Sequence, residues 1–318
     1  MSGHLLVVGS VNADIYCEIK NLPQPGETMD GKGGYVLPGG KGANQAVGAA
    51  RTASSCKVLF AGSFGNDNHA TMLRSQMTGH NVDLSVSSTA PVPSGQAFIL
   101  LQQGGQNSII IIGGANQEWP SPLEDKLVKA IKASRGVLLQ REVPEAINLQ
   151  VAQLASQAGV PVYMDVGGED SPLAPAIFPH IFLLSPNETE LARVSGLPTD
   201  TNDQIIVACK KLQKLGVKNV LVTLGTRGSI FVNESGRVYQ APSFKAAKVV
   251  DTTGAGDCYR AAFAVYLTEN GAKDVEKAML FASAASCLCV QKKGAMDGMP
   301  SRAEIQKFLD SLPKQAKL

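Results

Sequence analysis

The sequence predicts an α/β protein: a doubly wound, mostly parallel sheet flanked by helices, with a small β-sheet lid. Short β-branched runs alternate with amphipathic stretches along most of the chain, and these stretches carry apolar residues at three- and four-residue spacing. Strands that alternate with helices build βαβ units, in which a parallel sheet is covered on both faces. Two strand-like segments interrupt this alternation, and they predict the lid at approximately residues 15–37 and 93–112.

The predicted elements follow one another along the whole chain. The first strand covers residues 4–8, so we expect no signal or transit peptide before it. A hairpin is predicted within the second lid segment, from two β-runs joined by Gln103-Gly-Gly-Gln-Asn107. Residues 247–250 form a last β-run, and the pattern after Asp251 is almost wholly helical. The other strands are predicted at residues 58–61, 137–139, 160–164, 181–184 and 220–223, with helices at 67–78, 145–157 and 202–215. Asn202 is the expected N-cap of the last of these helices.

The length of 318 residues allows one large α/β domain or two smaller ones, and we expect a single domain spanning residues 1–318. With 44% hydrophobic and 18% charged residues, the chain can form a sizeable core. A net charge of +2 gives no basic excess for nucleic acid or a membrane surface. No apolar run approaches the ~18 residues that a membrane span needs. Six scattered cysteines without a CxxC pair predict reduced thiols. We expect a cytoplasmic protein, with a peroxisome-like organelle as the alternative, because Ala316-Lys317-Leu318 resembles a Ser-Lys-Leu address.

The segment Asp251-Thr-Thr-Gly254-Ala-Gly256-Asp257 carries the clearest chemical signal. The P-loop, dinucleotide and protein-kinase fingerprints are all missing from the sequence, so phosphate chemistry needs a different loop. Small residues at a helix start let a phosphate approach unpaired backbone N–H groups. Asp257, just inside that helix, is placed to accept a hydroxyl proton. The alternative is a plain loop whose acid is favoured by the helix dipole.

Two further glycine-rich segments carry polar side chains suited to a small polyol. Pro38-Gly-Gly-Lys41-Gly-Ala-Asn44 supplies hydrogen-bond donors beside flexible backbone, and Gly9-Ser-Val-Asn12-Ala-Asp14 follows the first strand. Ligands of open α/β sheets bind beyond the carboxyl ends of strands, where Asn12 and Asp14 are expected. The alternatives are a turn before a helix for the first segment and an Asx-turn for the second.

Ser185-Pro-Asn187-Glu-Thr-Glu190 follows the predicted strand at residues 181–184. Asn187 and Glu190 lie three apart at a helix start, where such a pair can organise a hydrated Mg²⁺ ion. The alternative is helix capping, with Ser185 or Asn187 as the cap and the acids in the first turn, and the two roles are compatible.

Together these segments resemble one family, the ribokinase-like (pfkB) carbohydrate kinases. Residues 251–257 look like its C-terminal signature, residues 39–46 like its N-terminal one, and residues 187–190 like its NxxE motif. Thr223-Leu-Gly-Thr-Arg-Gly228 looks like its nucleotide-binding strand and turn. The motifs stand in the family's order and span nearly the whole chain. Within the family, the strings Gly105-Gln-Asn and Gly113-Gly-Ala-Asn116 and the position of Glu142 resemble members that phosphorylate D-ribose.

The resemblance implies transfer of phosphate from ATP to the 5-hydroxyl of D-ribose. Asp257 would be the base, and the amides around Gly254, Ala255 and Gly256 would form the anion hole. Glu190, with Asn187, would help to place Mg²⁺ indirectly. The lids of two subunits would pair in a homodimer. The sugar would be held by Asn12, Asp14, Gly40, Lys41, Asn44 and Glu142, and ATP would be contacted by Asn187, Thr223, Leu224, Gly225, Thr226, Arg227, Gly228, Gly256 and Ser283.

The resemblance also implies an activating potassium ion beside the anion hole, held mostly by backbone oxygens. Its matching positions are Asp251, Thr253, Cys289, Lys292, Gly294 and Gly298. Carbonyls and a carboxylate suit a hard cation. Family members commonly have a serine where this chain has Gly298, so water is expected to complete the shell. The alternative is that Asp251 merely caps its glycine-rich turn.

Besides Gly298, the chain departs from the family pattern in three places near the expected site. One is Ser283, which stands where bacterial members often carry a histidine near adenine. Cys258-Tyr-Arg260-Ala follows the base where a small hydroxyl residue, Phe, a variable residue and Gly are usual. Asp165-Val-Gly-Gly stands where many members have Asn-Pro-Ala-Pro. Two other functions stay open: another kinase of the family, acting on deoxyribose, fructose or adenosine, and a non-catalytic sensor. Only 5% of residues are aromatic, which disfavours a nucleoside, and a sensor has no need of Asp257.

Overall fold

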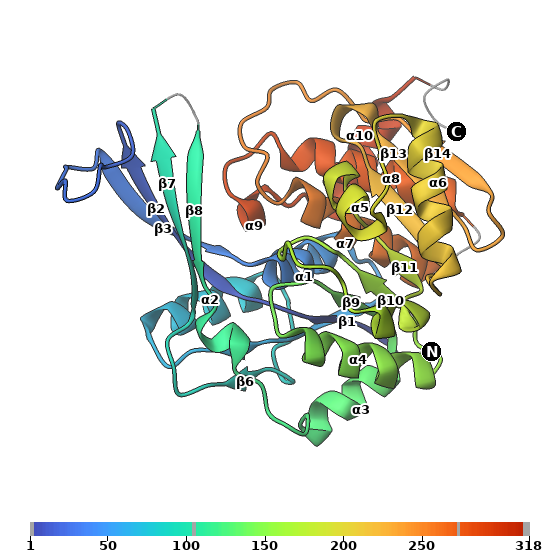
Figure 1. Ribbon diagram of the computed structural model, residues 1–318, viewed down its shortest axis with the longest axis horizontal. Coiled ribbons are helices and arrows are strands. Elements are labelled where there is room, and N and C mark those ends of the chain that lie inside the picture. Colours follow the sequence, from blue (N-terminus) through green and yellow to red (C-terminus); the bar gives the residue numbers. More distant parts are fainter. Residues whose placement is uncertain (1–2, 104–105, 272–273, 314–318) are drawn as a thin grey trace.

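The computed structural model describes residues 3–103, 106–271 and 274–313, and within them an eight-stranded sheet forms the centre of the main body (Figure 1). The strands from β4 to β12 pair in parallel, and β13 and β14 add an antiparallel edge. The predicted mostly parallel α/β sheet is therefore confirmed. In spatial order the strands are β14 (Val238–Ala241), β13 (Ser229–Val232), β12 (Asn219–Thr223), β11 (Leu183–Leu184), β10 (Val162–Met164), β9 (Ser134–Leu139), β1 (His4–Val8) and β4 (Lys57–Ala61).

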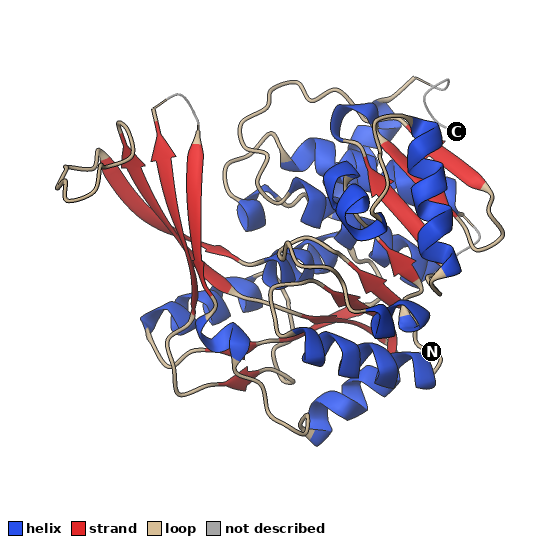
Figure 2. Cartoon of the chain, in the orientation of Figure 1, coloured by secondary structure: helices blue, strands red, loops and turns tan. Residues whose placement is uncertain are grey.

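Both faces of this sheet are buried, which explains why its strands are nearly continuous apolar runs. In β1, Leu5 and Val7 face one core cluster while Leu6 and Val8 face the other, as the period of two requires. One face is covered by α1 (Lys41–Thr52), α2 (Asn68–Gly79), α7 (Ala255–Asn270), α8 (Val275–Cys289), α9 (Ala295–Gly298) and α10 (Arg302–Ser311). The other is covered by α3 (Asp125–Ala133), α4 (Glu145–Gln157), α5 (Glu188–Ser195) and α6 (Asn202–Lys214) (Figure 2).

A second sheet stands away from the main body (Figure 1). Its order is β3 (Gly33–Gly39), β2 (Asn12–Ile19), β7 (Gly95–Gln102) and β8 (Asn107–Ile112). The central strands β2 and β7 are parallel, and β3 and β8 flank them in antiparallel pairing. The predicted hairpin of β7 and β8 is confirmed. Two short strands, β5 (Ser63–Phe64) and β6 (Ser88–Thr89), pair separately.

Two local predictions were wrong. Residues 247–250 form no strand, since Val249 and Val250 are 61% and 46% exposed and bury too little surface to hold one. The N-cap of α6 is Thr201 rather than Asn202, because Thr201 lies three residues before Gln204 and the two exchange the hydrogen bonds of a capping box.

The described helices include none long and apolar enough to cross a membrane. The C-terminal tripeptide Ala316-Lys317-Leu318 lies outside the described residues.

Candidate active site

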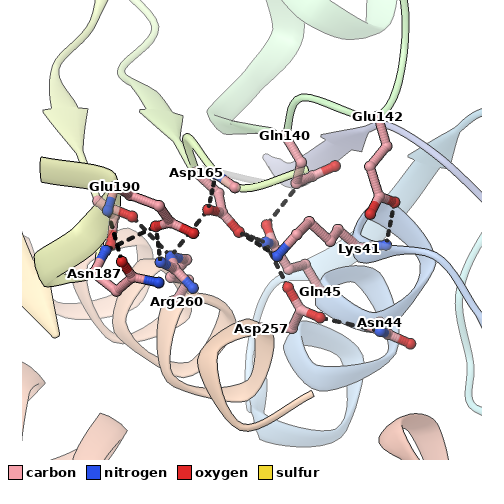
Figure 3. A network of polar contacts seen from close by, with 12 residues as sticks. Lys41, Asn44, Gln45, Gln140, Glu142, Asp165, Asn187, Glu190, Asp257 and Arg260 are labelled. Atoms are coloured by element: carbon pink, nitrogen blue, oxygen red, sulfur yellow. Dashed lines mark hydrogen bonds and ion pairs between the residues drawn. The ribbon is translucent and has the colours of Figure 1, made fainter. Parts of the chain in front are cut away.

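Asp257 lies in the first turn of α7 and is 6% exposed. Its two carboxylate oxygens accept hydrogen bonds from α1, one from Asn44 Nδ2 at 3.0 Å and one from Gln45 Nε2 at 3.1 Å (Figure 3). Burial raises the pKa of Asp257, and the nearby Lys41 ammonium and these two amides oppose that rise. The result is a held, desolvated carboxylate at a glycine-rich helix start, suited to receive a proton.

The turn that leads into α7 has the backbone that the sequence predicts for an anion site. Gly254 is the N-cap of α7 and adopts a φ of 77°, in the left-handed region that favours glycine. The Ala255 amide donates to the Thr252 carbonyl at 3.2 Å. The first amides of a helix have no partner within the helix, so this turn still presents N–H groups to a ligand.

The other acids predicted to hold the sugar lie beyond the ends of β1 and β9. Glu142 Oε2 accepts from Ser10 Oγ at 2.5 Å and from the Lys41 backbone amide at 2.9 Å. Asp14 lies on β2 beside Gly39, where a Cβ atom would come within 2.0 Å of the Asp14 carboxylate. Burial, with the charges of Glu142 and Asp257, raises the pKa of Asp14 to about 7. Burial likewise raises the pKa of Glu142.

Asn12 and Gly40 complete this side of the site. Asn12 is 4% exposed, and its Oδ1 accepts from Asn116 Nδ2 at 2.7 Å. Gly40 is the N-cap of α1 with a φ of 89°, and a Cβ there would lie 2.9 Å from the Asn12 amide nitrogen. A cavity of about 490 Å³ opens beside Asn12 and Glu142, and Ile111 of β8 forms part of its wall. The second sheet therefore contributes to the wall of the pocket.

Lys41 begins α1 and points its ammonium toward Asp165, at a distance of 3.7 Å (Figure 3). Asp165 is the main reason that the pKa of Lys41 is raised despite its burial. The Asp165 carboxylate also accepts from Gln45 Nε2 and the Gly167 amide, each at 2.9 Å. Lys41 is thus a cation held by a buried acid near Asp257, the predicted base.

The residues predicted to contact ATP lie at the neighbouring strand ends. Asn187 caps α5 and forms a capping box with Glu190, so the capping alternative holds. A bridge between Asn187 and Thr223 brings the capped helix to the turn Gly225–Arg227. Arg227 forms an ion pair with Glu188. Ser283 is buried in α8 against Tyr259, and its contact with ATP stays a prediction.

The two segments predicted to hold potassium meet in the structure. The Asp251 carboxylate accepts from the amides of Thr253 and Gly294, both at 2.9 Å. Burial favours the protonated acid, but these hydrogen bonds lower the pKa of Asp251 below its ordinary value. The Cys289 carbonyl accepts from the Lys292 amide at 3.2 Å, and a Cβ on Gly298 would lie 3.1 Å from that carbonyl. An ionised carboxylate beside backbone carbonyls is compatible with a hard cation.

Comparison with known proteins identifies the family. The model of the pfkB family carbohydrate kinases matches residues 2–302. The chain belongs to the pfkB family of carbohydrate kinases. It is 48% identical over 309 residues to a ribokinase of Arabidopsis thaliana, covering 96% of this chain and 80% of the relative. A solved structure of Arabidopsis thaliana ribokinase complexed with ribose and ATP superposes with a TM-score of 0.94 at 46% identity, covering 98% and 100% of the two chains. A ribokinase structure from Thermotoga maritima gives a TM-score of 0.86 at 35% identity, covering 97% and 99%.

Sequence reasoning missed several residues of this pfkB kinase that the structure brings into the site. Gln45 touches both Asp257 and Asp165, and Ser10 joins Glu142 to the Gly42 amide. Arg260 is buried beside Asp165 and Glu190. Gln45 carried a usable signal, since it is a second amide side chain directly after Asn44 in the glycine-rich segment that begins α1. Arg260 carried none on its own, because its partners lie 70 or more residues away in sequence.

Proposed function

We propose that this chain transfers the γ-phosphoryl group of Mg²⁺-bound ATP to the 5-hydroxyl of D-ribose, giving ribose 5-phosphate and ADP. The observation that carries the proposal is the placement of Asp257. It is buried and hydrogen-bonded by α1, next to the acids of the sugar side and on the turn of the expected anion hole. The names of the relatives compared above support ribose as the sugar and ATP as the donor.

In the proposed reaction the 5-hydroxyl gives its proton to Asp257 while its oxygen bonds to the γ-phosphorus. The bond from that phosphorus to the bridging oxygen breaks, and the electron pair leaves with ADP. Phosphoryl transfer depends mainly on positioning and charge stabilisation. Asn12, Asp14, Gly40, Lys41, Asn44 and Glu142 would hold the hydroxyls, and the turn at residues 254–256 would face the γ-phosphate.

Asn187 and Glu190 suit the indirect placement of Mg²⁺ that we propose. Their capping box leaves lone pairs on the Glu190 carboxylate, which is 12% exposed. Mg²⁺ usually keeps several waters in kinases and needs few protein ligands. When bound with ATP, the ion supplies positive charge to the phosphates.

We also propose that potassium activates the enzyme through the site around Asp251. When bound there, the cation supplies a fixed positive charge beside the turn that leads into α7. The carboxylate of Asp251 and the carbonyls of Thr253, Cys289, Lys292 and Gly294 would hold it. Activity should rise several-fold in potassium over sodium. Equal rates in potassium, sodium and a bulky organic cation would refute this site.

A coupled assay of ADP release tests the main proposal. D-ribose should exceed deoxyribose, fructose and adenosine in kcat/KM, and adenosine ahead of ribose would overturn the choice of substrate. Asp257→Asn should bind D-ribose normally by calorimetry but lose ~10²–10⁴ in turnover, the usual contribution of a general base. Near-normal turnover would refute the assignment of the base.

The second sheet supports a proposal that the chain forms a homodimer through its lid. The outer strand β8 exposes Ile109, Ile110, Ile111 and Ile112 by 53%, 58%, 54% and 51%. An apolar edge strand of this kind normally pairs or is covered. Ile110→Glu should shift the sedimentation of the chain to that of a monomer. Val207→Glu on α6, where the native valine is 57% exposed, is the matched control. A wild-type chain that sediments as a monomer would contradict the proposal.

We propose that the protein works in the cytoplasm, with the Ala316-Lys317-Leu318 tripeptide as the basis of the peroxisome-like alternative. Fusion of the last dozen residues to a fluorescent reporter separates the two locations. A punctate signal would favour the organelle.

A further inference from the structure

Two of the segments that depart from the family pattern, Asp165-Val-Gly-Gly168 and Cys258-Tyr-Arg260-Ala261, meet inside the protein, although Arg260 itself stands at a position that varies in the pattern. Asp165 follows β10 and Arg260 lies in the second turn of α7, yet Arg260 Nε is 3.5 Å from Asp165 Oδ1 (Figure 3). The side chain of Arg260 is 7% exposed and that of Asp165 is 0% exposed. Buried ions of this kind need partners, and each here is the partner of the other.

The Arg260 guanidinium touches three parts of the site at once. Its Nε donates to the Ser185 carbonyl at 2.9 Å, in the segment that precedes the capped helix α5. Its Nη2 lies 3.4 Å from Glu190 Oε2. Its Nη1 lies against Gly256, where a Cβ atom would come within 2.6 Å of it. The Arg260 side chain therefore connects the turn of the expected anion hole with Glu190, the acid expected to help place Mg²⁺.

Asp165 links the Arg260 guanidinium to the side of the site where the sugar is expected. Asp165 contacts the Lys41 ammonium at 3.7 Å and the Gln45 amide at 2.9 Å, and Gln45 also holds Asp257. The result is a buried chain of charge from Lys41 through Asp165 and Arg260 to Glu190 (Figure 3). Its two ends belong to the sugar side and the nucleotide side of the site.

We propose that Arg260 is a positioning residue for phosphoryl transfer, which fixes the Gly256 turn and Glu190 relative to Asp165 and Lys41. The proposal rests on the proposed kinase function. Arginine suits this task because its planar fork bonds several acceptors at once, whereas lysine offers one point charge. Arg260 also offsets the negative charge of Asp165, Glu190 and Asp257, which together raise its pKa against the effect of burial.

The test compares Arg260→Met, which removes the charge and the fork, with Arg260→Lys, which keeps the charge. In Arg260→Met, kcat should fall by ~10²-fold, the usual cost of a misplaced reacting group, while the Kd of D-ribose changes little. Arg260→Lys should recover part of kcat. It cannot recover all of it, because one ammonium cannot reach both the Ser185 carbonyl and Glu190.

The pH profile of kcat separates positioning from packing. The charged groups around Asp257 are Lys41 from α1, Asp165 from the end of β10, Glu142 from the end of β9, Asp14 from β2 and Arg260 from α7 itself. Removing one positive charge makes the Asp257 carboxylate harder to ionise. The acidic limb of the profile should therefore move to higher pH in Arg260→Met and stay in place in Arg260→Lys.

Arg302→Met is the matched control. Arg302 also pairs with an almost buried carboxylate, Glu269 at 2.8 Å, and also donates to a backbone carbonyl, that of Thr52. The Arg302→Met substitution should lower the melting temperature but leave kcat and its pH profile unchanged.

The proposal is overturned if Arg260→Met keeps wild-type kcat. It is also overturned if the fractional loss of kcat in this variant equals the fraction of unfolded protein measured by thermal melting. It is also overturned if the acidic limbs of the Met and Lys variants coincide. If Arg260→Met does not fold, a fully active Arg260→Lys with an unchanged Kd for D-ribose would also overturn the role of the fork. A wild-type chain that phosphorylates no sugar would instead refute the proposed function.

Discussion

Asp14 should destabilise the ligand-free protein at neutral pH, and its removal should reveal by how much. The acid lies partly buried on β2 between the charges of Glu142 and Asp257, and its pKa is raised from 3.8 to about 7. The folded protein therefore holds this proton more tightly than the unfolded chain does. Stability is lost as the pH rises from about 4 to about 7 and is constant above that, for a total of at most about 4 kcal/mol.

The substitution Asp14→Asn removes this cost while keeping the shape of the side chain, which lies over Gly39. Relative to wild type, the free energy of unfolding of the variant should increase with pH. Integration between about pH 5.5 and about pH 8 gives a gain of about 2 kcal/mol. The same variant should bind D-ribose more weakly, because a proposed acceptor for a sugar hydroxyl has lost its charge. Stability gained at the expense of function is common at active sites.

Urea unfolding at the two pH values, without sugar, measures the effect. Asp30→Asn changes the charge at an exposed position near β3 and serves as the control. An Asp14→Asn variant whose stability gain is the same at both pH values would refute the reasoning, as would a variant that is less stable than wild type near pH 8.

Three further predictions concern other parts of the fold. Gly42→Ala should weaken binding of D-ribose in calorimetry and lower the free energy of unfolding in urea by ~1–3 kcal/mol, since the added Cβ would lie 2.6 Å from the Ser10 amide nitrogen. Unchanged binding would show that the backbone at Ser10 can move aside without affecting the pocket. Glu269→Gln should lower unfolding free energy by ~2 kcal/mol at neutral pH, because Glu269 accepts from the amides of Ser54 and Ser55 at 2.7 Å. These hydrogen bonds lower the pKa of Glu269 against the effect of burial, so the deficit should shrink as the pH falls; a deficit that grows in acid would contradict this. Gly298→Ser should lower the potassium concentration for half-maximal activity, and Gly298→Ala, which adds the Cβ without the hydroxyl, should not; equal behaviour of the two variants would argue against a hydroxyl ligand.

Local patterns predicted most of the framework. The strand at β1, the helix at α4 and the alternation between them follow from apolar spacing alone. Capping of α5 was predicted with Ser185 or Asn187 as the cap, and the structure has Asn187. The β-run at residues 247–250 misled because β propensity does not guarantee a partner strand. There the Val250 amide pairs with the Val290 carbonyl at a helix end.

The pairing of Asp165 with Arg260 could not be predicted from local pattern, because the two residues are 95 positions apart and neither has a periodic context. Asp165 was visible in the sequence as a departure from the family pattern, whereas Arg260 stands at a position that varies in that pattern. Their meaning depends on how β10 and α7 pack, and that packing is decided by the core residues around them. The two acceptors of Gln45, Asp165 and Asp257, likewise lie 120 and 212 positions away in the sequence, so local pattern could not pair them with it.

The strand β2 connects the second sheet to the proposed sugar pocket. It runs without a break from Asn12 and Asp14 at the proposed sugar pocket to Ile19 in the second sheet, paired with β7 along its length and with β3 as far as Glu18. Because β2 is hydrogen-bonded to both neighbouring strands, it is stiff. A tilt of the second sheet at Ile19 should therefore shift Asn12 and Asp14 at the other end of the strand. We therefore expect contacts far out on the second sheet to change the affinity of the proposed pocket for its sugar, even where they do not touch the ligand.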